Sequence, residues 1–243
     1  MTESALDPAE LSSVEYRLDS YTALLRSFRS AGYTFSRFDP ADPPETGEIL
    51  LRHDVDLSIG RALAMAERER ELGVRSTYCF LLSAPVYDLT RPQNARAIRR
   101  IAKLGHDIAL HFDTRTYWVA DDEPSAESVA AKVTDELEVL GRLVGEEPST
   151  VSFHIPPSWV LDRSFEEFTN TYAPPFFSRI GYRSDSSQKW TDADPFPDGL
   201  PDAFQLLVHP GLWNATHRPM AEIVDALRQQ THGQVDGYFD RLG

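Results

Sequence analysis

The chain has 243 residues, of which 41% are hydrophobic and 11% aromatic, and its 24 basic and 38 acidic side chains leave a net charge of −14. This apolar content excludes a disordered chain, and the length suits a single large α/β domain. The acidic balance argues against binding to nucleic acid or to an anionic membrane, and no apolar run reaches the roughly 18 residues of a membrane span.

The N-terminus and the cysteine content bear on the cellular compartment. The first seven residues are acidic and lack the basic start and apolar stretch of a secretory signal. The single cysteine, Cys79, has no partner for an intramolecular disulfide, and its apolar neighbours indicate a small buried core residue. We therefore expect a cytoplasmic protein.

The chain begins with a predicted N-terminal segment, residues 1–47, that packs on the main domain, residues 48–243. Ser12 and Glu15 form a capping box, and an apolar stripe from Val14 to Phe28 predicts a helix that ends at Gly32. A short strand over 33–38 and a proline-rich acidic connection complete this segment.

Strands and helices alternate in the main domain. Strands are predicted at 48–54, 76–82, 107–112, 151–154 and 204–209, and helices at 58–72, 95–104, 125–144 and 220–228. This order implies parallel strands joined by right-handed crossovers. Residues 155–201 are rich in prolines and aromatics and predict loops with short strands. The whole pattern favours one α/β domain.

The first strand of the main domain ends in Asp54, Val55 and Asp56. Because side chains alternate along a strand, Asp54 and Asp56 share one face and Val55 points to the other. Two neighbouring carboxylates repel each other unless a cation or a proton offsets the repulsion. The pair is therefore a candidate cation site, or else a solvated acidic turn with a helix cap.

Histidines end three further strands, at His111, His154 and His209. Ligands of parallel α/β sheets and barrels bind at these carboxyl ends. His111 and Asp113 share a face, and imidazole with carboxylate suits Zn²⁺, or Fe, Mn or Co. Alternatively, His111 donates to a backbone carbonyl in the core, and Asp113 caps the next loop or orients His111.

The segments after these strands add further candidates for binding and catalysis. His154 and His209 can each exchange a proton at neutral pH, as a general acid for a leaving amine must, or else are plain loop histidines. Trp159, Trp190 and Trp213 are candidates to stack on a sugar ring, or else to seal the base of a lid.

The order of these motifs resembles that of the polysaccharide deacetylase family (NodB homology, carbohydrate esterase family four). The family's Thr-Phe-Asp-Asp-Gly corresponds to 51–56, with Asp54 at its first Asp, and its Gly-His-Glu-Ile-Gly to 105–109, ahead of His111. Its Arg-x-Pro is similar to 154–156, its region containing Asp and Trp to 182–190, and its Leu-x-x-His to 206–209.

Three positions depart from the family pattern. Val55 stands where the family has a metal-binding Asp, and Arg115 where it has its second metal-binding His. His154 replaces the family's Arg that pairs with the catalytic Asp. Asp56 and Asp113 are the candidates for the missing metal ligands, and the chain resembles a divergent branch of the family.

The resemblance implies a distorted (β/α)7 barrel and a metal-dependent hydrolase that removes an acyl group, N-acetyl in the simplest case, from a carbohydrate or polysaccharide precursor. Asp56, His111 and Asp113 would hold a divalent metal ion. Zn²⁺ is the first candidate for this ion, and Fe, Mn and Co are the alternatives. Asp54 would take a proton from water, His209 would protonate the departing amine, and His154 would orient Asp54 or contact substrate.

Two other functions stay open on the same scaffold. One is hydrolysis of a non-sugar amide or a cyclic imide. The other is a catalytically inactive sugar-binding homologue, which the loss of family ligands at Val55 and Arg115 favours.

Overall fold

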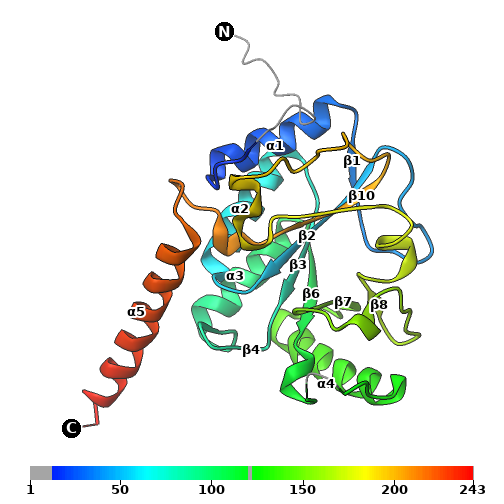
Figure 1. Cartoon of the computed structure of the whole chain (residues 1–243). Helices are drawn as coiled ribbons and strands as arrows, with labels where there is room; N and C mark the ends of the chain where they lie inside the picture. Colours follow the sequence, from blue (N-terminus) through cyan, green and yellow to red (C-terminus); the bar gives the residue numbers. More distant parts are fainter. Residues whose placement is uncertain (1–12, 120–121, 243) are drawn as a thin grey trace.

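A parallel β-sheet forms the centre of the computed structural model, which describes residues 13–119 and 122–242 (Figure 1). Its strands are β1 (Thr34–Ser36), β2 (Glu48–Val55), β3 (Thr77–Phe80), β6 (Asp107–Phe112), β7 (Thr150–Phe153), β8 (Thr169–Asn170), β9 (Gly181–Ser184) and β10 (Phe204–Val208). Their order is β8-β7-β6-β3-β2-β10-β9, and β1 pairs with the first residues of β2. A separate hairpin joins β4 (Ser83–Ala84) to β5 (Tyr87–Asp88).

The curled sheet and its helices confirm the predicted α/β barrel class. Helices α2 (Ile59–Leu72), α3 (Pro92–Lys103) and α4 (Ala126–Val144) make the crossovers as far as β7. From β7 to β10 the chain uses short 3-10 turns instead of α-helices. No pairing joins β8 to β9 in the part of the chain that the structure describes. The barrel is therefore incomplete, with its α-helical layer beside the first strands.

Three apolar clusters pack against the sheet. The largest lies between the sheet and α2, α3 and α4, and the second lies between β2, β10 and helix α1 (Leu18–Ser30). Both contact the face of β2 that carries Ile49, Leu51 and Val55. The opposite face is covered by a third cluster, in which Leu50 packs with Phe38, Ala173 and Phe176. Every residue from Ile49 to Val55 is buried. A strand covered on both faces carries a nearly continuous apolar run, so the polar residues that interrupt it stand out.

Capping chemistry accounts for the helix boundaries that the sequence predicted well. Ser58 accepts a hydrogen bond from the backbone N–H of Arg61, and Gly73 ends α2 with a φ of 67°. At this left-handed angle glycine has no steric cost. Ser125 caps α4 in the same way as Ser58 caps α2.

The predicted start of the first helix is wrong, because α1 begins at Leu18. Ser12 lies outside the described residues. Val14 and Tyr16 are buried, and the backbone N–H of Val14 donates to the carbonyl of Trp190. Burial of these two side chains near the loop that contains Trp190 keeps residues 13–17 out of α1. This tertiary packing outweighs the local capping signal.

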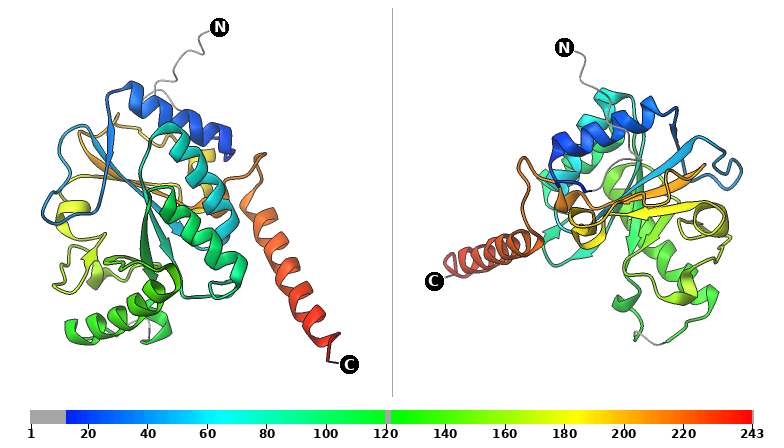
Figure 2. Two further views of the ribbon diagram at one scale, coloured as in Figure 1. Left: turned by 180° about the vertical axis from the view of Figure 1, so that it is seen from behind. Right: turned by 45° about the horizontal axis from the view of Figure 1, so that its top comes forward.

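Helix α5 (Met220–Phe239) is longer than the predicted 220–228, and it extends away from the rest of the molecule in both views of Figure 2. Ile223 is its one buried residue.

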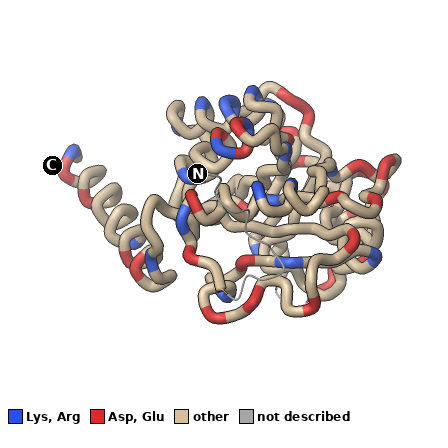
Figure 3. The backbone as a smooth tube through the Cα atoms, turned by 90° about the horizontal axis from the view of Figure 1, so that it is seen from above, with Lys and Arg blue, Asp and Glu red and all other residues tan. Residues whose placement is uncertain are grey.

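Acidic and basic residues are interspersed over the helices and loops of the body (Figure 3). Within the described ranges, no helix combines the length and apolarity that a membrane crossing requires.

Candidate functional site

Four polar side chains meet at the carboxyl ends of β2, β6, β7 and β10: Asp56, His111, His154 and His209. Each follows or ends a parallel strand, so the sheet brings together residues that are far apart in the sequence. The Nε2 atom of His209 lies 3.8 Å from Oδ2 of Asp56. The strand ends therefore form one compact polar centre.

Three of these residues present ligand atoms to a common point. Nε2 of His111 lies 3.1 Å from Oδ1 of Asp56 and 3.1 Å from Nδ1 of His154, and the His154 and Asp56 atoms are 3.5 Å apart. Bonds of about 2.0–2.1 Å to a tetrahedral ion separate ligand atoms by roughly 3.3 Å. The spacing of the three atoms matches such an ion.

The hydrogen bonding of the group also fits a cation. Nδ1 of His111 lies 3.3 Å from the carbonyl oxygen of Ser152, and donation there leaves a lone pair on Nε2. That lone pair faces Oδ1 of Asp56, a buried oxygen for which no hydrogen-bond donor is found among the described residues. Two acceptors at this separation require a proton or a metal ion between them.

Asp56 is held in its ionised form. Burial by itself would raise the pKa of the Asp56 carboxyl, but His111 and His154, when protons on their rings face the carboxylate, outweigh this effect together with the charge of His209 and hold the pKa well below its usual range. A carboxylate and two imidazoles are a ligand set that Zn²⁺ and other divalent transition metals accept.

Asp54 lies beside this group and is paired with Arg52. The Nη2 atom of Arg52 is 3.1 Å from Oδ2 of Asp54, and both side chains are almost completely buried. Ser152 donates its hydroxyl to the same carboxylate oxygen at 3.3 Å. Oδ1 of Asp54 has no hydrogen-bond partner among the residues that the structure describes. One oxygen is therefore anchored, and the other can accept a proton.

The Arg52 guanidinium is itself fixed from several directions. It donates through Nη1 to Gln205 at 2.5 Å and to Thr171 at 3.0 Å, and through Nη2 to the Tyr172 hydroxyl at 2.8 Å. Burial is the largest single influence and would raise the pKa of Asp54, but the charges of Arg52, His111 and His209 together outweigh it, and the pKa is lowered. Arg52 therefore keeps Asp54 ionised and restricts its orientation.

His209 is held by the fully buried Asp185. Nδ1 of His209 lies 2.6 Å from Oδ1 of Asp185, and the Trp213 indole N–H donates to Oδ2 of Asp185 at 2.8 Å. Burial would lower the pKa of His209, but the charge and hydrogen bond of Asp185, together with the charges of Asp56 and Asp54, outweigh it and raise the pKa to about 9. His209 is therefore protonated at neutral pH, with Nε2 toward Asp56.

Asp113 does not join the predicted metal group. The strand ends at Phe112, and Asp113 caps the following turn by accepting the backbone N–H of Arg115 at 3.0 Å. This is the capping alternative that the sequence left open. His154 takes its place among the three residues that present ligand atoms. Val55 packs in the core, as the alternation along β2 predicts.

The burial of Trp190 and Trp213 contradicts the prediction that these two rings stack on a sugar. The two rings are 2% and 0% exposed and pack in the cluster beneath α1, so neither ring offers a face to a substrate. This matches the alternative of a sealed base. Trp159 is only partly buried, next to the larger cluster, and it remains a candidate for substrate contact.

Two residues of the site, Arg52 and Asp185, received no role from the sequence. Arg52 precedes Asp54 by two residues and therefore shares its face of β2. The alternation rule that placed Asp54 and Asp56 on one face could also have identified Arg52 as a neighbour of Asp54. Asp185 follows β9, which was not predicted as a strand, and its partner His209 is 24 residues away. No local pattern connects those two residues.

No protein-family model and no curated protein matches the chain. A search of solved structures finds a family 4 acetyl xylan esterase from Clostridium thermocellum in complex with a cobalt ion, with 16% identity over 76% of this chain and 84% of that one and a TM-score of 0.44. It also finds a peptidoglycan deacetylase from Bacillus subtilis, with 15% identity, coverage of 78% and 86%, and a TM-score of 0.44.

A carbohydrate esterase family 4 pseudoenzyme from Bacillus anthracis is similar as well, with 12% identity, coverage of 79% of this chain and 63% of that one, and a TM-score of 0.45. Two of these three structures carry the name of the family that the sequence motifs resemble. At such identities the similarity concerns the fold.

Proposed function

We propose that the chain is a divergent polysaccharide deacetylase of carbohydrate esterase family four, which hydrolyses an N-acyl group, N-acetyl in the simplest case, on a carbohydrate. The observation that carries this proposal is the meeting of Asp56, His111 and His154 with ligand spacing, beside a carboxylate and a protonated histidine. A base, an acid and a metal site are the groups that metal-assisted amide hydrolysis needs.

The residues that would hold the metal are Asp56, His111 and His154, and Zn²⁺ is the first candidate because it accepts both imidazole and carboxylate. When bound, the ion polarises the acyl carbonyl and makes a water molecule more acidic. His154 thereby replaces the family's second metal-binding histidine, whose position is occupied by the exposed Arg115.

Asp54 would act as the general base. Arg52 holds its carboxylate ionised, and the unpartnered Oδ1 can accept the proton of the attacking water. Arg52 also performs from β2 the pairing that the family assigns to the arginine of its third motif. The substitution of that arginine by His154 therefore does not leave Asp54 without a cation.

His209 would act as the general acid. An amine is a poor leaving group unless it is protonated, and His209 carries a proton at neutral pH because of Asp185. Asp185 holds Nδ1, so Nε2 donates toward the departing nitrogen. This acid suits an amide substrate, because an amine is the product that must be protonated as it departs.

The test compares the Asp54→Asn variant with the wild type after both have been shown by elemental analysis to hold equal metal. We expect the release of acetate from a panel of acetylated sugars to fall by about 10²–10⁴-fold in kcat, the range for loss of a general base. Asp113→Asn is the matched control, since Asp113 lies outside the group, and it should retain its rate.

Each competing function has its own outcome in this test. A metal-loaded Asp54→Asn protein that keeps the wild-type rate contradicts the proposal. Release of ammonia from a primary amide, or of a ring-opened product from a cyclic imide, without release of acetate from the acetylated sugars, indicates an amide or imide hydrolase. Less than about a tenth of an equivalent of metal, after growth with the metal supplied, against the one equivalent that a single site binds, indicates the inactive sugar-binding homologue.

A further inference from the structure

Gly211 lies in the 3-10 turn η6 (Pro210–Leu212), two residues beyond His209, and it is buried. Its φ lies outside the left-handed range, so the turn does not need a glycine for its backbone conformation. A glycine also costs more conformational entropy on folding than any other residue. Close approach of another part of the chain is the remaining physical reason for a glycine at this position.

The space beside Gly211 is filled by Leu57. A β-carbon on Gly211 would lie 2.5 Å from Cβ of Leu57, 2.9 Å from its Cδ1 and 3.0 Å from its Cγ. This is the closest such approach among the glycines that the structure describes. Carbon atoms in contact are about 3.5–4.0 Å apart, so an alanine at this position requires a displacement of about 1 Å. Because the backbone fixes Cβ of Leu57, rotation of the leucine side chain cannot supply it.

This contact joins two parts of the candidate site. Leu57 directly follows Asp56, whose Oδ2 lies 3.8 Å from Nε2 of His209. Arg61, in the first turn of α2, donates a hydrogen bond to the carbonyl of Gly211. The turn between β2 and α2 is thus held against η6 by a close apolar contact and by a hydrogen bond.

The turn η6 is the more firmly anchored of the two segments. The backbone N–H of His209 donates to both carboxylate oxygens of Asp185, at 3.0 and 3.1 Å, and the Trp213 indole donates to the same carboxylate. Every residue of η6 is buried. Asp56 and Leu57 are only partly buried and lie between the end of β2 and the start of α2. An added methyl group on η6 would therefore displace the turn that carries Asp56.

Asp56 has little room for such a displacement. Its Oδ1 lies 3.1 Å from Nε2 of His111 and 3.5 Å from Nδ1 of His154. The groups of a binding site must keep within about 0.5 Å of their productive positions. A shift of about 1 Å in the turn would take Asp56 outside this tolerance.

We propose that Gly211 is a positioning residue: its lack of a side chain lets Leu57 approach closely enough to hold Asp56 at ligand spacing from the two histidines. This inference rests on the proposed function for the role of the metal. Gly211 and Leu57 act through Asp56, and neither is a ligand itself.

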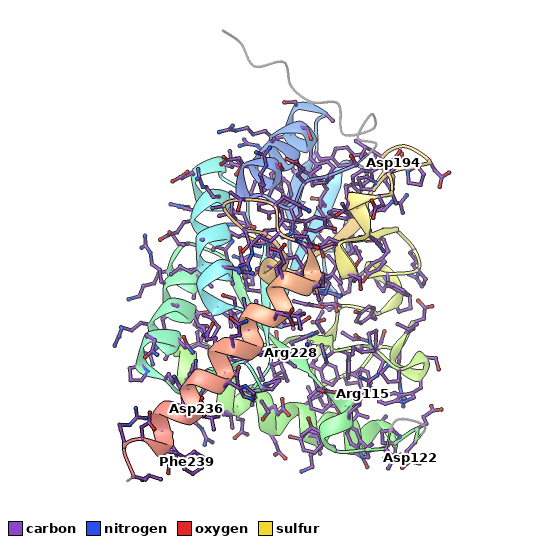
Figure 4. The ribbon with its side chains drawn as sticks, turned by 60° about the vertical axis from the view of Figure 1, so that its left-hand side comes forward. Arg115, Asp122, Asp194, Arg228, Asp236 and Phe239 are labelled. Carbon is purple, nitrogen blue, oxygen red and sulfur yellow. The ribbon has the colours of Figure 1, made fainter. Side chains whose placement is uncertain are left out.

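The first test measures Zn²⁺ affinity by competition with a chelator. Gly211→Ala should bind Zn²⁺ about 10–100-fold more weakly than the wild type, the range for loss of a group that orients a metal ligand. Gly233→Ala is the matched control and should keep the wild-type affinity. Gly233 also has an ordinary φ, and no described atom lies within 4 Å of a β-carbon placed there. It lies on α5 between Arg228 and Asp236, both labelled in Figure 4.

Two double variants test whether the two β-carbons cause the effect. Leu57→Gly/Gly211→Ala removes the β-carbon that the new methyl group would meet, so it should bind Zn²⁺ more tightly than Gly211→Ala. Leu57→Ala/Gly211→Ala keeps that β-carbon and should bind no more tightly than Gly211→Ala. Effects at independent sites multiply to within about twofold, so recovery in the first double variant alone would identify this contact.

Leu57→Gly covers the case in which Gly211→Ala does not fold. It empties the contact without crowding it, and its Zn²⁺ affinity should fall by about tenfold. Ser58→Gly is its control, because it loosens the same turn but leaves Leu57 against Gly211, and it should cost less. Urea unfolding of each variant establishes that it is folded.

Wild-type Zn²⁺ affinity in folded Gly211→Ala, equal losses in Leu57→Gly and Ser58→Gly, or equal affinities in the two double variants would each overturn the inference. These outcomes leave the proposed function intact. Absence of Zn²⁺ binding to the wild type contradicts the proposed function, and the positioning role of Gly211 falls with it.

Discussion

Replacing Arg52 with methionine removes the guanidinium that faces Asp54 and keeps an unbranched side chain in its place. The two charged groups are 3.1 Å apart, with side-chain exposures of 0% and 4%. The Asp54 carboxylate would then be buried without a cation, and the acceptors Gln205 and Thr171 would lose their donor. Burial of an uncompensated charge and of unpaired polar atoms is costly.

The size of the effect follows from this burial. Removing one partner of a buried ion pair costs about 3–5 kcal/mol of unfolding free energy. At about 2–4 °C per kcal/mol for a chain of this length, the expected fall in Tm is about 6–20 °C. The pair Arg37 and Asp107 offers a control, because its side chains are 51% and 33% exposed. Arg37→Met should cost only about 0–1 kcal/mol.

The assay is urea unfolding, followed by the fluorescence of the buried Trp190 and Trp213. The Arg52→Met change is made in the wild type and in the D54N background, where no carboxylate charge remains to be compensated. We expect the cost to be smaller in the D54N background by ~1–3 kcal/mol. A loss below ~1 kcal/mol in the wild type, or equal losses in both backgrounds, would refute the reasoning.

Three further predictions concern the acid, the metal and the core. His209 must be protonated to act, so activity should be lost as pH rises through about 9, and Asp185→Asn should move that loss toward the ordinary histidine pKa near ~6.5 in pH–rate profiles. His154→Ala should bind metal well below one equivalent by elemental analysis, whereas Asp113→Ala should not. Glu69→Ala should cost about 3–5 kcal/mol in urea unfolding, because Glu69 is completely buried against His53.

The pH dependence of the Glu69 contribution has a definite sign. Burial would raise the pKa of Glu69, but His53 and its other partners lower it, so the stabilisation is present above the ordinary pKa of about 4.3 and is lost as pH falls through the lowered value. A Glu69→Ala cost that does not shrink in acid contradicts this account. An unmoved alkaline limit in Asp185→Asn, or full metal in His154→Ala, contradicts the other two.

Features that depend on neighbouring residues follow directly from the amino-acid order. Alternation along one strand placed Asp54 and Asp56 on the same face, and Val55 on the other. Serine caps and left-handed glycines set the limits of α2 and α4. Alternating strands and helices specified a parallel sheet, and the carboxyl ends of its strands located the candidate site.

The residues that complete the site are selected by contacts between distant segments of the chain. Past the end of a strand the alternation rule no longer applies, so Asp113 turns to cap its own loop while His154, on a neighbouring strand end, joins Asp56 and His111. The assignment of Asp185 to His209 likewise depends on pairing between β9 and β10. Side-chain direction in a loop is set by contacts with distant segments, and a local sequence pattern carries no record of those contacts.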